Sequence, residues 1–161
     1  MPIASHRIDD RLVHGQVVVG WGQPLDVAFL VVVDDMLATS PWEQELYRLA
    51  APPELEMRFV TVPEAAAAHA TWEDDPRVGM VLTADVATMA RLADAVASIR
   101  RVTVGGLHAG PGRGERLRYV FLDAPDAGRL AALAARGVDV VAQDLPAARA
   151  VPLAEWGGAT P

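Results

Sequence analysis

Apolar residues along this chain form short runs that alternate with stretches of helical periodicity. The clearest run is 27–33, seven consecutive apolar residues rich in valine, which ends at Asp34 and Asp35. A run of this length and composition, bounded by polar residues, is typical of a strand buried on both faces of a parallel sheet.

A helix is predicted directly after this strand. Ser40 and Pro41 suit the N-cap and first-turn positions, and Glu43 suits the acidic position of a capping box. Apolar residues then recur at i, i+4, i+7 and i+8 from Trp42. This spacing predicts a helix that buries one stripe, with Trp42 in the core.

The same alternation continues to the end of the chain. Further strands are predicted at 3–9, 57–62, 78–82, 102–104, 119–122 and 138–142. Helices are predicted at 65–70, at 85–98 and from Asp123 to Gly137, and the apolar segment 16–21 has helical character. Thr61 with Glu64, and Asp123 with Asp126, carry the N-terminal capping signals.

Strands that alternate with helices through short connections predict an α/β fold, with an open, mostly parallel, doubly wound sheet and helices on both faces. We expect one domain over residues 1–161. Ligands of such sheets bind outside the carboxyl ends of the strands. The loops of interest therefore begin at Asp9, Asp34, Thr83 and Gly105.

Composition removes several functional classes. All 14 basic residues are arginines and cysteine is absent, which excludes catalytic lysines, disulfides and thiolate chemistry. A net charge of -7 disfavours nucleic acid and anionic membranes as partners. The charged amino terminus lacks the pattern of a signal peptide and no apolar run could span a bilayer, so we expect a cytoplasmic protein.

The loop Asp9–Gln16 concentrates chemistry at the end of the first strand. Arg11 offers a planar fork for phosphate oxygens, His14 a nucleophilic nitrogen near neutral pH, and Gly15 a backbone N–H that can approach an anion closely. A neutral imidazole surrounded by fixed donors can accept and pass on a phosphoryl group. A histidine in a loop can equally be an ordinary surface residue, and spacing alone does not separate the two interpretations.

The run from Arg7 to Val17, RIDDRLVHGQV, closely resembles the amino-terminal motif of IIB subunits of the mannose, fructose and sorbose family of the bacterial phosphotransferase system. The resemblance continues over nearly the whole chain, through residues 33–35, 49–53, 104–107, 136–138 and 143–146. The family's loop histidine corresponds to His14 without a gap.

This resemblance implies a phosphotransferase in which His14 takes a phosphoryl group from a IIA partner. The group then passes to a sugar bound by the membrane components IIC and IID, with no cofactor. Arg11 would steady the phosphate and Asp10 would orient Arg11 or the imidazole. The remaining predicted phosphate-binding residues are Gly15, Gln16, Gly105 and Gly106. Whether the chain forms a homo-oligomer is left open.

The glycine-rich segment 105–114 has two interpretations. Its first glycines could let the loop approach the phosphate on His14, with His108 and Arg113 nearby, or the segment is a surface loop. A dinucleotide-binding loop is disfavoured because it should follow the first strand and open a helix. The segment also departs from the family pattern at Ala109–Pro111, and an alternative function is a regulatory module that transfers nothing to a sugar.

Other polar residues have simpler interpretations. Asp34 would oppose a phosphate unless it is paired or turned away, whereas Asp35, Thr83 and Asp85 fit strand-end turns and helix caps. His6 and His69 have no metal-ligand spacing, and we expect no metal site. Asp9 and Asp10 are adjacent, so a strand would direct them to opposite faces.

Overall fold

The computed structural model describes residues 3–158, with the side chain of Gln16 excepted. Its centre is a seven-stranded sheet with the order β3-β2-β4-β1-β5-β8-β9, in which only β9 runs antiparallel to its neighbour. The strands are β1 (Ile3–Ile8), β2 (Val27–Val33), β3 (Glu56–Val60), β4 (Val78–Thr83), β5 (Arg101–Val104), β8 (Asp139–Ala142) and β9 (Val151–Pro152). The predicted α/β fold with an open, mostly parallel sheet is confirmed.

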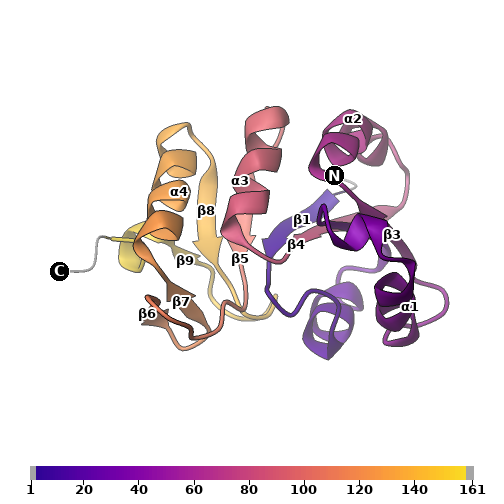
Figure 1. Cartoon of the computed structure of the whole chain (residues 1–161), viewed down its shortest axis with the longest axis horizontal. Helices are drawn as coiled ribbons and strands as arrows, with labels where there is room; N and C mark the ends of the chain where they lie inside the picture. The colour runs from indigo at the N-terminus through magenta and orange to yellow at the C-terminus, as the bar shows by residue number, and fades with distance from the viewer. Residues whose placement is uncertain (1–2, 159–161) are drawn as a thin grey trace.

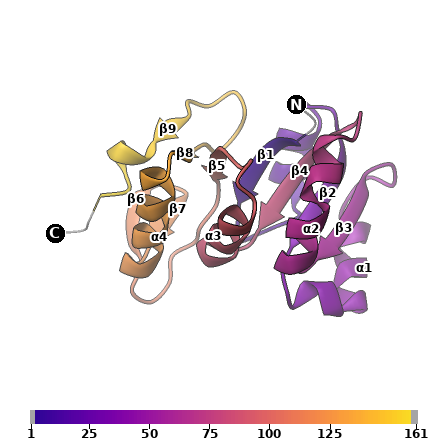
Figure 2. The same ribbon diagram turned by 90° about the horizontal axis from the view of Figure 1, so that it is seen from above.

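Helices α2 (Val62–Glu73), α3 (Val86–Ala95) and α4 (Ala124–Ala135) stand in a row along the sheet (Figures 1 and 2). They cover one face, where apolar side chains from every central strand form the larger core. The π-helix η1 (Gln16–Gly22) packs on the other face over β2, β4 and β3, and α1 (Pro41–Leu49) contributes Tyr47 to the same cluster. The 3-10 turns η2 (Leu37–Thr39) and η3 (Leu153–Glu155) complete the set.

The predicted caps form where a side chain can reach a free backbone N–H. Thr61 and Glu64 make a reciprocal capping box at α2, and Asp85 and Asp123 cap α3 and α4. Ser40 occupies the N-cap position of α1, but its side chain makes no capping hydrogen bond. Residues 40–43 therefore predicted the start of the helix correctly, but the capping hydrogen bond expected from Ser40 does not form.

One strand prediction needs correction, and two short strands were not predicted. Tyr119–Leu122 does not join the main sheet: β7 (Val120–Leu122) pairs with β6 (Gly114–Leu117) in a separate antiparallel hairpin. This hairpin stays close to the end of β5 because Leu107 exchanges backbone hydrogen bonds with Tyr119 and Phe121. The sequence analysis missed β6 and β9, which are short and lack an apolar run.

The prediction that Trp42 lies in the core is wrong. Trp42 is 69% exposed, and Leu46 and Leu49 on the same helical stripe are also exposed. Instead α1 turns Tyr47 toward Phe59 of β3, at a ring distance of 6.1 Å. Periodicity predicted a helix, but it could not tell which side of the helix the sheet would cover.

His6 and His69 meet inside the larger core. Their Nε2 atoms are 2.8 Å apart and their rings are stacked, although 63 residues separate them. Burial, helped by the neighbouring His69, lowers the pKa of His6 from 6.5 to about 3. Both rings are neutral at pH 7, so one donates a hydrogen bond and the other accepts it.

The exposures of two tryptophans predict opposite stability effects. Trp72 of α2 is 4% exposed, and Trp72→Ala should lower the free energy of unfolding by about 3–5 kcal/mol, since it leaves a large cavity. Trp42→Ala should change it by less than about 0.5 kcal/mol. Urea unfolding measures both, and a large loss with Trp42→Ala in the isolated chain would contradict the exposed position.

The histidine pair predicts acid sensitivity. Because the folded pKa of His6 is below the unfolded value, its contribution is complete above about pH 6.5 and is lost as the pH falls toward 3. Over this range the unfolded chain binds a proton that the folded chain does not, which costs about 1.4 kcal/mol per pH unit. His6→Gln should make the free energy of unfolding, measured from pH 7 to 4, less steep by that amount. An unchanged slope would contradict a buried neutral His6.

Candidate functional site

The loop after β1 leaves the carboxyl edge of the sheet between two neighbouring strands. The backbone N–H of Asp9 donates to Thr83 at the end of β4, and that of Asp10 donates to Gly106 after β5. Leu12 then adopts a left-handed conformation with φ of 55°, an uncommon one for a residue with a side chain. The loop is thus held from both sides before it reaches His14.

Asp9 is the centre of the site. Its carboxylate has no exposed surface and accepts hydrogen bonds from the backbone N–H, Nε and Nη2 of Arg11, at 3.0–3.1 Å. Its Oδ2 also lies 3.3 Å from Arg7 Nη2 and 3.4 Å from His14 Nε2. Burial alone would raise the pKa of Asp9, but the His14 ring, Arg11 and Arg7 together hold this pKa well below its usual range.

Arg7 contacts this carboxylate from the interior of the protein. It is fully buried, and its guanidinium donates to the backbone carbonyls of Gln143 and Asp144 at 2.8 and 3.2 Å. Its Cζ lies 4.6 Å from the ring centre of Trp21. A buried cation is stable only when it is paired and hydrogen-bonded. Asp9 and the two carbonyls supply partners for Nη1 and Nη2, whereas Nε is buried without a hydrogen-bond partner among the described residues.

Gly105 and Gly106 give the two arginines their space. A Cβ at Gly105 would lie 2.3 Å from Arg7 Nη2, and one at Gly106 would lie 2.9 Å from Arg11 Nη2. Any side chain would therefore displace a guanidinium. Both residues pack against the arginines of the loop, and this packing gives them a structural role. Direct binding of phosphate by them stays a prediction.

Asp10 contacts the glycine-rich segment, and the role predicted for it in orienting Arg11 or the imidazole stays a prediction. Asp10 accepts from the backbone N–H of His108 and lies 2.6 Å from His108 Nδ1, with Arg113 Nη1 at 4.0 Å. Asp9, on the opposite face, contacts Arg11 and the His14 ring instead. Asp10 thus connects the loop to the glycine-rich segment.

Arg11 and His14 are the partly exposed members of the site, with 31% and 19% of their side chains exposed. Gly15 is the N-cap of η1, whereas the Gln16 side chain lies outside the described part of the chain. Phosphate binding by these two residues stays a prediction. Beside Arg11 lies a pocket of about 230 Å³, lined also by Gly106, His108, Arg118, Tyr119 and Asp144 among others.

Asp34 and Asp35, which follow β2, make structural hydrogen bonds. Asp34 is turned away, since its Oδ1 accepts from the N–H groups of Met36 and Leu37. Asp35 accepts from Val62 N and pairs with Arg91.

Within the described residues no group of three or more His, Asp or Glu side chains could hold a metal ion. No helix among them is long and apolar enough to cross a membrane.

Sequence reasoning included Asp9 and Arg7 in the motif but assigned Asp9 no role. Their spacing was the usable signal, because residues two apart on an extended chain point to the same face, and Arg7 Nη2 lies 3.3 Å from Asp9 Oδ2.

Comparison with known proteins agrees with this architecture. The N-acetylgalactosamine-specific phosphotransferase enzyme IIB component 1 of Escherichia coli is 30% identical over 141 residues, which cover 87% of this chain and 89% of the relative. The crystal structure of the IIB component 1 of that bacterium gives a TM-score of 0.84 at 30% identity, covering 92% and 97% of the two chains.

Two further relatives have different specificities. The sorbose-specific EIIB component of Klebsiella pneumoniae is 32% identical over 78% of this chain and 77% of its own length. The mannose-specific EIIAB component of Escherichia coli is 29% identical over 87% of this chain but only 43% of its own length.

The parallel sheet and the loop at its carboxyl edge are thus those of an α/β component of the sugar phosphotransferase system. More specifically, residues 3–156 match the PTS system sorbose subfamily IIB component, and the chain belongs to this family. IIB components of this family are phosphotransferases that carry a phosphoryl group in sugar uptake.

Removal of the central carboxylate charge tests the site. Asp9→Asn leaves Arg7 buried without its counter-charge and should lower the free energy of unfolding at pH 7 by about 3–5 kcal/mol. The stabilisation by Asp9 is present above its unfolded pKa and is lost as the pH falls through the folded one. The difference between wild type and variant should therefore shrink below about pH 4.

The matched control is Asp139→Asn, which removes the partner of Arg101 from an exposed ion pair. Its effect in the same urea titration should stay below about 1 kcal/mol. Equal losses in the two variants would contradict a central role for Asp9.

Proposed function

We propose that His14 is the residue that carries the phosphoryl group, received from a IIA donor and delivered to a sugar bound by the IIC and IID membrane components. The observation that supports this most directly is the contact of a partly exposed imidazole with a buried carboxylate that two arginines hold ionised. The similarity to a mannose-specific EIIAB component supports a IIA donor.

The geometry favours Nδ1 of His14 as the reacting atom. His14 Nε2 is buried and lies 3.4 Å from Asp9 Oδ2. A proton on Nε2 facing the carboxylate leaves the lone pair of the neutral ring on Nδ1. Asp9 would thus select the tautomer and the orientation of the nucleophile.

In the proposed step, the Nδ1 lone pair attacks the phosphorus of the donor phosphohistidine. The N–P bond of the donor breaks, and its electron pair returns to the donor imidazole. Positive charge that develops on the His14 ring is stabilised by Asp9 through Nε2–H. Arg11, with 31% of its side chain exposed, would face the phosphoryl oxygens.

The second transfer, from His14 to the sugar, uses the same nitrogen atom. A sugar hydroxyl oxygen attacks the phosphorus, the Nδ1–P bond breaks with its electron pair returning to the His14 ring, and the hydroxyl proton passes to solvent. No nucleotide takes part, because the phosphoryl group originates from phosphoenolpyruvate. Sugar choice is assigned to the membrane components.

The phosphorylation test uses the full chain with phosphoenolpyruvate labelled in its phosphoryl group, the upstream phosphocarriers and a IIA donor. The wild type should gain an acid-labile, alkali-stable label, and His14→Ala should gain none. His108→Ala is the matched control, since it removes a nearby exposed histidine, and should keep the label. Undiminished labelling of His14→Ala would overturn the assignment.

Arg11→Gln should slow the labelling about 10²–10³-fold, because it removes the positive charge that faces the phosphoryl oxygens.

Nuclear magnetic resonance of the labelled imidazole identifies the phosphorylated nitrogen, expected to be Nδ1. Membrane vesicles that contain IIC and IID, together with a sugar, should drain the label. Retention of the label would favour the regulatory alternative.

A further inference from the structure

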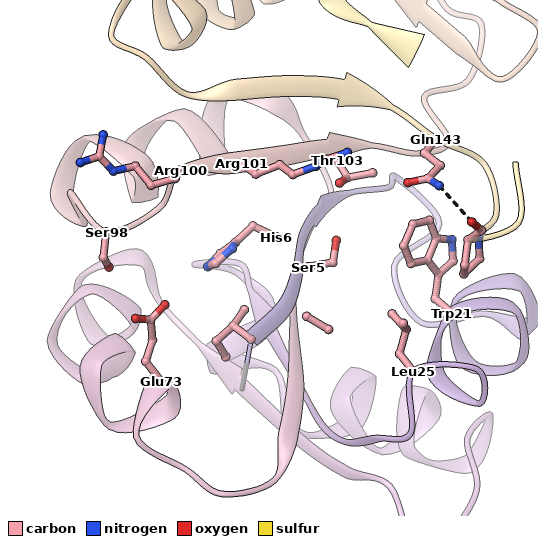
Figure 3. A pocket seen from close by; sticks show the side chains of 13 residues that line it. Ser5, His6, Trp21, Leu25, Glu73, Ser98, Arg100, Arg101, Thr103 and Gln143 are labelled. Carbon is pink, nitrogen blue, oxygen red and sulfur yellow. Dashed lines mark hydrogen bonds between the residues drawn. The ribbon is translucent and has the colours of Figure 1, made fainter. Parts of the chain in front are cut away.

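A second concave site runs along β1 and β5, from Glu73 at the end of α2 to Trp21 of η1. It is a cavity of about 530 Å³ whose floor is formed by β1 and β5. Trp21, Leu25 and Gln143 lie together at one end of it (Figure 3), and Pro146 also lines it. This volume is in the range of pockets that hold small organic molecules.

The floor of this cavity carries hydroxyl groups in place of apolar side chains. Ser5 is 8% exposed, and its Oγ is buried with no hydrogen-bond partner in residues 3–158. Figure 3 shows Ser5 and Thr103 on neighbouring strands, with the Ser5 hydroxyl directed toward β5. A buried hydroxyl without a partner is destabilising, and a ligand hydroxyl placed in the cavity would satisfy it.

Thr103 lies one register step further along the same face, since it pairs with Arg7 of β1. It is buried, and its hydroxyl makes no hydrogen bond within the described residues. The Gln143 amide on the cavity wall already donates to the carbonyls of Pro146 and Ala148. The cavity therefore offers two hydroxyls of the floor to a polar ligand.

Positive charge lines one end of the cavity. Arg100 and Arg101 both contribute to its lining. Arg101 pairs with Asp139 at 3.3 Å, whereas the Arg100 guanidinium makes no ion pair in the described part of the chain. Glu73 lies across the cavity from them (Figure 3). An anion would therefore sit on the arginine side, away from Glu73.

We propose that this cavity binds a monosaccharide phosphate, with sugar hydroxyls on Ser5 and Thr103 and the phosphate at Arg100 and Arg101. Hydroxyl groups on the floor and guanidinium groups at one end match the two parts of such a molecule. The choice of a phosphorylated sugar also rests on the proposed function, since phosphoryl transfer to a sugar forms this class of compound.

The position of the cavity brings a ligand close to the histidine loop without contact with it. Trp21, which lines the cavity, packs on Arg7, and Arg7 holds Asp9 beside His14. Ser5 and Arg7 are two residues apart on the same face of β1. A molecule in the cavity would therefore rest against the residues that support the site.

Isothermal titration of the full chain tests the proposal with the 6-phosphates of glucose, mannose and N-acetylgalactosamine. The free sugars and inorganic phosphate are the comparison arms. At least one sugar phosphate should bind at least tenfold more tightly than its free sugar and than inorganic phosphate. Equal binding of inorganic phosphate, or no binding of any sugar phosphate at 10 mM, would overturn the proposal.

Variants locate the binding. Thr103→Val keeps the shape of the side chain and should weaken binding about 3–10-fold through the lost hydrogen bond. Arg100→Gln should weaken it about 10–100-fold, as expected for a bond to a charged group. Arg129→Gln on α4, which removes an arginine paired with Asp126, is the matched control and should bind as the wild type. Unchanged binding in both Thr103→Val and Arg100→Gln would reject this cavity.

The two proposals fail separately. His14→Ala should lose the phosphoryl label and retain sugar-phosphate binding, whereas Thr103→Val should retain the label and bind more weakly. Ser5→Ala should fold with a melting temperature equal to or above that of the wild type, since it removes an unpaired buried hydroxyl. Loss of sugar-phosphate binding in His14→Ala would place the ligand at the histidine loop and overturn the second site.

Discussion

The contact on which this structure depends most is that of the buried Asp9 carboxylate with Arg7, Arg11 and the His14 ring. An ionised carboxylate is costly to bury, and so is a guanidinium. Each makes the burial of the other tolerable, and neither could be removed alone at small cost. The exposed surface of the site, Arg11 and His14, is therefore held by a charge pair that the solvent does not reach.

The parallel sheet places the strand ends that hold this arrangement beside one another. Because β1 lies between β4 and β5, the loop that starts at Asp9 donates backbone hydrogen bonds to carbonyls at or just after the ends of both neighbours. The carbonyls of Gln143 and Asp144, just after β8, reach Arg7 from the next strand along. The carboxyl ends of the parallel strands thus supply carbonyl acceptors to one point, at the edge of the sheet where ligands of such sheets bind.

Much of the fold follows from the sequence because its strongest signals are local. The run 27–33 became β2 buried along most of its length, and Thr61 with Glu64 formed the predicted box. What could not be predicted was which side of an element meets another. Trp42 is exposed because α1 presents Tyr47 to the sheet, and β7 left the main sheet for a hairpin with β6.

The site shows the same division between local and tertiary information. The motif from Arg7 to Gln16 marks the loop in which these charges meet, but the sequence does not show that Asp9 contacts Arg11 and His14 while Asp10 contacts His108. The absence of lysine then acquires a structural meaning. A planar guanidinium can donate to Asp9 and to two carbonyls at once, as Arg7 does, whereas an ammonium is a compact and strongly hydrated charge. Gly105 makes room for this group, because the guanidinium fills the space that a side chain at position 105 would occupy.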